Sequence, residues 1–246
     1  MRLKRMLVLI LAILFTAGIA SADYKVTQKH HQDGFSMMGQ TQPEKDEVHI
    51  IWIGEGTLRM DQGAVSTVVD LDGKKMTIIN HDDKDYSEIA LPVNLEELLP
   101  PGMGQQMMEM MKFEVTVTPS DETKKIGEWT AKRYDMVLTS AMMGMESVIW
   151  ASDETPFDFA EYFKLYSTVM SLQPGMDSMM EQMQKIDGFV VAQDAKMSMK
   201  FMGDTTVGST DEVVSIEELD APDGTYAPPA GYAKKEFDFM ASMQRQ

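Results

Sequence analysis

Methionine is the residue type whose abundance and spacing could do chemistry in this chain. There are 25 methionines among 246 residues, and there is no cysteine. Four methionines spaced i, i+3, i+4 and i+7 predict one apolar stripe along a helix: Met176, Met179, Met180 and Met183. A second stripe of this kind contains Met103, Met107 and Met110 or Met111. Thioethers on one helix face can pack a core, line an apolar pocket or bind a soft metal ion.

Other methionines alternate along segments that are expected to be strands. Met143 and Met145 point to the same side of an extended chain, and so do Met197, Met199 and Phe201. The helices and the sheet are therefore both expected to present thioethers to a shared interior.

This pattern leaves three interpretations open. Methionine can simply fill the core, or it can line a cavity for an apolar ligand, since unbranched polarizable side chains repack around irregular guests. The third interpretation is a Cu(I) site, which thioethers suit. Against copper, the chain has no cysteine and four histidines, none of them spaced as a ligand beside a methionine pair. His30 and His31 are adjacent, so on a strand they face opposite sides. No metal site and no cofactor are predicted.

A catalytic constellation is not recognisable from the sequence. The chain contains no Gly-x-Ser-x-Gly elbow, no cysteine nucleophile and no His-Glu-x-x-His motif. Gly102 and Gly104 lack the spacing and the lysine of a phosphate-binding loop. We therefore predict a non-enzymatic protein with no catalytic residues.

The N-terminus has the parts of a secretory signal peptide. Basic residues at Arg2, Lys4 and Arg5 precede an apolar run at 6–19 and the small residues Ala20-Ser21-Ala22. The run is short for a bilayer span, which takes about 20 apolar residues. We predict cleavage after Ala22, export to the periplasm and no stable membrane insertion. The predicted division is a signal peptide at 1–22 and a single domain at 23–246.

The charge of the chain limits its partners. There are 39 acidic and 22 basic residues, which gives a net charge of −17. Such a charge repels phosphate backbones, so nucleic acid is excluded as a partner. An apolar ligand and a protein partner in the cell envelope remain.

The periodicity of the chain predicts an α+β fold made of a long antiparallel sheet with a few helices on one face. A polar loop is expected at 33–46, and Asp72-Gly73 is a strong hairpin signal. Short helices are expected within 94–111, where Pro100-Pro101-Gly102 interrupts the helix and 104–111 resumes it, and at 156–170 and 176–186. The expected strands cover residues 24–31, 48–53, 57–61, 66–71, 75–80, 86–89, 113–118, 130–139, 143–151, 189–202 and 205–219.

Several short motifs carry a resemblance to known exported proteins. They are VTQK at 26–29, IIWIGEGTLRMD at 50–61, STVVDLDGK at 66–74 and MTIIN at 76–80. This order resembles the periplasmic lipoprotein carriers of the LolA and LolB type and the related sigma-factor regulator RseB. The segments KIGEWTAKRY at 125–134, VIWAS at 148–152 and PAGY at 229–232 are similar to an exported family, domain of unknown function 4412.

The resemblance implies a curved, incomplete antiparallel half-barrel with helices as a lid over an apolar cavity, which in the carriers takes lipid acyl chains. It places Arg59 where the second strand of the carriers contributes to the lining, although the neighbours of Arg59 differ. The carriers begin with a helix before the first strand, whereas this chain would start almost at the strand after cleavage.

The resulting prediction is a periplasmic protein that binds a lipid or an acyl chain in a Met-rich half-barrel. A soft-metal binder and a protein-interaction or stress-sensing module are the alternatives. The strand registers can slip by one residue, which would exchange the two faces of the sheet. With that proviso, the expected lining consists of Trp52, Leu58, Met60, Met136, Met143, Met145, Met197, Met199 and Phe201.

Overall fold

The computed structural model describes residues 22–37, 40–94, 98, 113–140, 143–172, 177–199 and 205–239. Residues 1–21 of the expected signal peptide lie outside these ranges, as do nearly all of the expected helix at 94–111 and Phe201. Met103, Met107, Met110, Met111 and Met176 of the two methionine stripes also lie outside them.

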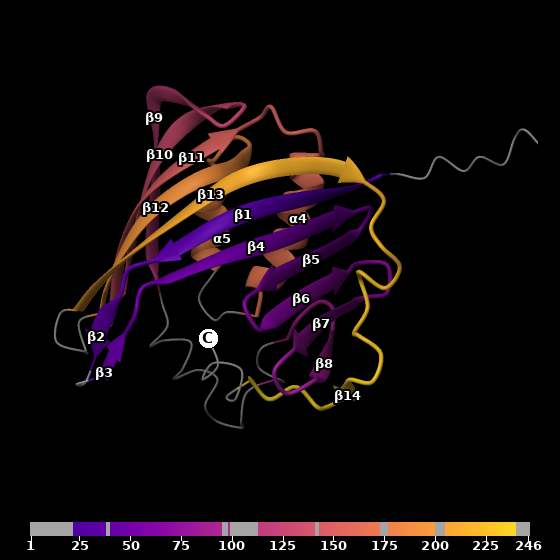
Figure 1. The fold of residues 1–246 in the computed structure, drawn as a ribbon. Helices are drawn as coiled ribbons and strands as arrows, with labels where there is room; N and C mark the ends of the chain where they lie inside the picture. The colour runs from indigo at the N-terminus through magenta and orange to yellow at the C-terminus, as the bar shows by residue number, and fades with distance from the viewer. Residues whose placement is uncertain are drawn as a thin grey trace, which may run out of the picture.

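A large curved antiparallel sheet forms the body of the protein (Figure 1). Its twelve strands run in the order β14-β8-β7-β6-β5-β4-β1-β13-β12-β11-β10-β9, and only β14 pairs in parallel, with β8. The sheet is open, with β14 at one edge and β9 at the other. The strands of this sheet are β1 (Asp23–Gln32), β4 (Lys45–Gly54), β5 (Thr57–Gln62), β6 (Val65–Asp70), β7 (Lys75–Asn80), β8 (Asp85–Ala90), β9 (Glu114–Ile126), β10 (Trp129–Thr139), β11 (Met143–Ser152), β12 (Phe189–Met199), β13 (Thr205–Leu219) and β14 (Ala233–Lys234).

The expected sheet with few helices is confirmed, although strands dominate and the described residues contain two helices. The expected polar loop at 33–46 is corrected in part. A two-stranded hairpin of β2 (Phe35–Met37) and β3 (Gln40–Gln42) lies within it, and β4 already begins at Lys45. β2 and β3 pair antiparallel from Phe35–Gln42 to Met37–Gln40, and β4 is paired with β1 from Lys45 onward.

The position of β1 is the feature of the topology that organises the interior. β1 pairs with β4 on one side and with β13 on the other, so the first and last long strands of the chain are neighbours. The strands from β4 to β8 continue outward from β1 as consecutive hairpins, and β9 to β13 return to it as a second set. Residues far apart in the sequence therefore meet on β1.

Two helices pack on one face of the sheet (Figure 1). Helix α4 (Phe159–Met170) is N-capped by Asp158, whose carboxylate accepts hydrogen bonds from the backbone N–H groups of Ala160 and Glu161. The Glu161 side chain accepts from the backbone N–H of Gly56 at 2.9 Å, which ties the first turn of α4 to the β4–β5 turn.

The second helix, α5 (Asp177–Met183), is attached to the edge strand β9. The hydroxyl of Ser178 donates to the backbone carbonyl of Phe113 at 3.0 Å, and the side chain of Gln182 accepts from the backbone N–H of Val117 at 3.2 Å. These contacts satisfy backbone groups that an edge strand would otherwise expose.

The buried residues form two hydrophobic clusters under the two helices. The larger lies between α4 and the strands around β1, β4 and β5, and it includes Leu58, Trp150 and Leu165. The smaller lies between α5 and β9 to β11, and it includes Val117 and Tyr134. The space where these clusters meet is the site described next.

Candidate functional site

A cavity of about 340 Å³ lies between the helices and the sheet, at the junction of the two core clusters. Ile51 and Phe189 of the larger cluster line it together with Met136 and Ile186 of the smaller one. Helix α4 covers the larger cluster and helix α5 covers the smaller one. Where these two clusters face each other, their side chains leave space unfilled. The cavity walls are mostly hydrophobic with a few polar groups, as is usual for small-molecule sites.

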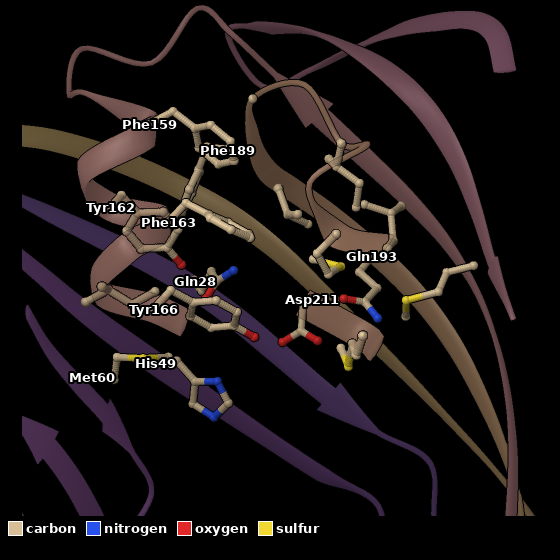
Figure 2. Close-up of a pocket in the computed structure, with 18 of the residues that line it drawn as sticks. Gln28, His49, Met60, Phe159, Tyr162, Phe163, Tyr166, Phe189, Gln193 and Asp211 are labelled. Atoms are coloured by element: carbon tan, nitrogen blue, oxygen red, sulfur yellow. The ribbon is translucent and has the colours of Figure 1, made fainter. Parts of the chain in front are cut away.

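Helix α4 supplies an aromatic wall (Figure 2). Its four cavity-lining residues stand at i, i+3, i+4 and i+7: Phe159, Tyr162, Phe163 and Tyr166. Tyr162 stacks on Tyr166 with ring centroids 5.8 Å apart, and its ring meets that of Phe189 edge-on at 4.9 Å. These contacts give the aromatic side of the cavity a fixed shape.

Thioethers supply much of the remaining lining. Met60, Met136 and Met145 come from β5, β10 and β11, while Met179 and Met183 come from α5. Met60, Met136 and Met145 belong to the lining expected from the sequence, and Met179 and Met183 belong to the expected helical stripe. The same cavity thus receives methionines from the sheet and from a helix.

The other residues of the expected lining have different places. Leu58 is fully buried in the larger core cluster and does not reach the cavity. Met143 and Met197 are half-buried, and the register pairs Met145 with Met197 and Met143 with Met199. These four methionines share a face, but among them only Met145 lines the cavity.

Trp52 must be removed from the lining because it projects from the other face of the sheet. It alternates with the core residues Ile51 and Ile53, and the ammonium group of Lys25 lies 5.9 Å from its ring. Arg59 is the cross-strand partner of Trp52 and shares that face. It donates hydrogen bonds to the Asp61 carboxylate and to the backbone carbonyl of Thr225, both at 2.7 Å.

One end of the cavity is polar. His30 on β1, His49 on β4 and Asp211 on β13 lie there, with glutamine side chains beside them. His30 Nδ1 is 2.9 Å from Asp211 Oδ1, and the rings of His30 and His49 stack with centroids 4.9 Å apart. In Figure 2, the Asp211 carboxylate lies beside the Tyr166 hydroxyl of α4, and Gln193 lies farther from the helix. The glutamines that line the cavity are Gln28, Gln62 and Gln193.

The neighbouring histidine confirms the expectation that His30 and His31 face opposite sides. His31 is half-buried on the other face, and its ring nitrogens lie 2.8 Å from Asp46 and 3.3 Å from Asp33. His30 instead points to the cavity. Burial, followed by repulsion from His30, lowers the pKa of His49. This shift favours the neutral imidazole of His49, which has a nitrogen lone pair.

The buried phenols of α4 predict a loss of stability at alkaline pH. Burial raises the pKa of both Tyr162 and Tyr166. Because the folded-state pKa lies above the unfolded value of about 10, this stabilisation is complete below pH 10 and is lost as the pH rises further. We expect the free energy of unfolding to decrease above about pH 10, and to decrease less steeply in Tyr162→Phe. Denaturant titrations on both sides of pH 10 measure this, and equal slopes in the variant and the wild type would contradict it.

Sequence reasoning missed the aromatic wall and the polar end. The aromatic spacing of α4 was present in the sequence as a helical stripe. No comparable signal marks His30, His49 and Asp211, because they lie on three separate strands whose neighbourhood depends on the pairing of β1 with β13.

No protein-family model matches the chain, and no curated protein sequence matches it. Within the described ranges, none of the helices has the length and apolarity needed to cross a membrane. The shape and chemistry of the cavity are therefore the basis for assigning a function.

Proposed function

We propose that this protein is a non-enzymatic binding protein, exported to the periplasm, that holds a lipid or an acyl chain in its Met-rich cavity. The observation that carries this proposal is the unfilled space of about 340 Å³ between the sheet and the two helices. Its volume is at the lower end of the range for small-molecule pockets, which suits one chain better than several.

The lining favours a flexible apolar guest. Five methionines and five aromatic side chains of α4 and β12 surround the cavity, and thioethers adapt to irregular apolar shapes at low cost. The aromatic wall is fixed by ring contacts, whereas Met145, Met179 and Met183 are only partly buried. One wall can thus adjust to a chain while the other holds its position.

The arrangement of the helices also supports a carrier-like role. Both helices contact the sheet largely through side chains, and the described hydrogen bonds between α5 and β9 are single side chain to backbone contacts. Such contacts can re-form after a small shift of the helix. This is the behaviour that the resemblance to the half-barrel lipoprotein carriers implies.

Apolar burial supplies enough free energy for retention. Each buried methylene contributes about 0.8 kcal/mol, so ten of them contribute about 8 kcal/mol. That corresponds to a Kd of about 1 μM before the cost of ordering the chain is subtracted. A weak or moderate affinity of this kind is suited to a protein that takes up and releases its ligand.

Native mass spectrometry of the purified protein, followed by organic extraction, tests the proposal. We expect a co-purifying lipid or fatty acid, and we expect free fatty acid to displace a fluorescent analogue from the protein. Absence of both a co-purifying lipid and fluorescent fatty-acid binding would contradict the proposal.

Polar substitutions in the thioether wall should weaken this binding. Met145→Gln and Met183→Gln place an amide against the bound chain, which costs about 1–2 kcal/mol and corresponds to roughly tenfold weaker binding. Val137→Gln is the matched control, since Val137 lies on the outer side of β10 and is 47% exposed. Fluorescent fatty-acid titrations compare the three variants. Equal affinities in all of them would place the ligand outside this cavity.

A further inference from the structure

Three side chains at the polar end of the cavity have the composition of a metal site. His30, His49 and Asp211 come from the three neighbouring strands β1, β4 and β13. We propose that they bind a divalent transition-metal ion of the Zn²⁺ class. This inference goes beyond the binding of an apolar ligand and does not depend on it.

The pairing of the strands explains why these side chains converge. β1 lies between β4 and β13, and His30 is directly opposite Asp211 in the register. His49 is opposite Gln28, one alternation away from His30 on the same face. Strands that are paired on both sides hold their side chains more rigidly than loops do, which favours a defined site.

The distances are compatible with one ion. One ligand atom from each residue can be chosen so that all three lie within 4.8 Å of one another. Zinc bonds to histidine nitrogen and carboxylate oxygen at about 2.0–2.2 Å, so two ligands on one tetrahedral ion are about 3.4 Å apart. Binding one ion requires the stacked rings of His30 and His49 to turn out of their nearly parallel arrangement, because an imidazole nitrogen binds a metal in the plane of its ring.

The set of donor atoms selects the class of metal. Two imidazole nitrogens and one carboxylate oxygen suit Zn²⁺ and similar ions, whereas Ca²⁺ and Mg²⁺ prefer oxygen ligands and Cu(I) prefers sulfur. Three protein ligands leave a coordination position for water or a bound molecule. Because all three residues line the cavity, that position is accessible from the cavity.

A second carboxylate lies next to the three ligands. Glu47 Oε2 is 3.8 Å from His49 Nε2, and Glu47 is directly opposite His30 in the register. It adds negative charge beside a cation and can orient the imidazole, as carboxylates commonly do around metal sites.

A purely structural hydrogen bond accounts for only part of this arrangement. The contact of 2.9 Å between His30 and Asp211 would satisfy those two residues by themselves. It does not include His49, which is only 9% exposed, stacks on His30 and lies 3.8 Å from Glu47. A metal ion gives all three side chains a common partner.

Isothermal titration of the metal-free protein with Zn²⁺ tests the site, and the visible absorption of bound Co²⁺ reports a tetrahedral environment. We expect one equivalent of tight Zn²⁺ binding. His30→Gln, His49→Gln and Asp211→Asn should each weaken it by about 100-fold or more, because each variant removes one of three ligands. His31→Gln is the matched control and should bind Zn²⁺ as the wild type does, since His31 lies on the opposite face with Asp33 and Asp46.

Absence of Zn²⁺ binding, or binding that the three variants leave unchanged, would overturn the proposal. An equal loss in His31→Gln would also overturn it by indicating adsorption to the acidic surface. Should His49→Gln fail to fold, as judged by circular dichroism, the partly exposed His30 and Asp211 variants still decide the result. Fatty-acid binding is measured in the same proteins. A protein that binds fatty acid but not Zn²⁺ would overturn the metal site alone, and one that binds Zn²⁺ but not fatty acid would contradict the proposed function alone.

Discussion

Replacing Gly188 by alanine is expected to lower the free energy of unfolding by about 4 kcal/mol. Gly188 has a φ of +107°, a backbone conformation that residues with a Cβ rarely adopt. A Cβ at this position would also lie 2.3 Å from the carbonyl oxygen of Ser152 and 2.8 Å from the backbone nitrogen of Asp153. These are backbone atoms at the end of β11, so they cannot move aside as a flexible side chain would. The loss is a large fraction of the stability of an ordinary domain.

Gly224→Ala separates the cost of the positive φ from the cost of the steric clash with the backbone of Ser152 and Asp153. Gly224 also has a positive φ, at +85°, but a Cβ there would meet nothing within 4 Å. We expect it to lose only the cost of backbone strain, about 1 kcal/mol. Denaturant unfolding followed by tryptophan fluorescence gives both values. Similar losses in the two variants would show that the close approach of Gly188 to Ser152 has no energetic consequence.

Phe189→Ala is expected to lower the free energy of unfolding by about 3–5 kcal/mol. Phe189 is 2% exposed, and its ring contacts those of Phe157 and Tyr162 with centroids 5.1 and 4.9 Å away. Truncation removes these contacts and enlarges a cavity that is already present, so the surrounding side chains cannot close the gap. Both the lost apolar burial and the added void contribute to the effect.

Two further substitutions test that explanation. Phe189→Leu keeps most of the volume and should cost about 1–2 kcal/mol. Val214→Ala should change the stability by less than about 0.5 kcal/mol, because Val214 is 50% exposed. Denaturant unfolding of all three variants gives the order, and a loss in Phe189→Ala no larger than that in Val214→Ala would exclude Phe189 from the core.

Local sequence patterns were sufficient for the elements of this fold. The Asp72-Gly73 turn between β6 and β7 is a short-range signal, and the structure contains this strand pair where it was expected. Helix α4 begins at the Asp158 cap, close to the expected start. These features depend on neighbouring residues, so one sequence is enough to predict them.

The faces of the strands were harder to assign than the strands themselves. Met60 and Met145 line the cavity as expected, whereas Trp52 projects from the opposite face. β4 is buried on both sides near its end, so its apolar residues run consecutively and hydrophobicity does not reveal which of them face inward. Only the register with β1 and β5 settles that choice.

The sequence by itself determined the strand-rich antiparallel architecture, the methionine stripes and the absence of a recognisable catalytic motif, because each of these is a local pattern. The tertiary structure decided which side chains share a space. Bringing His30 next to Asp211 requires β1 to pair with β13 across 181 residues of chain. The cavity is likewise a property of two core clusters that meet without filling the space between them. Pairing over such separations is selected by the packing of the whole sheet, and no short segment encodes it.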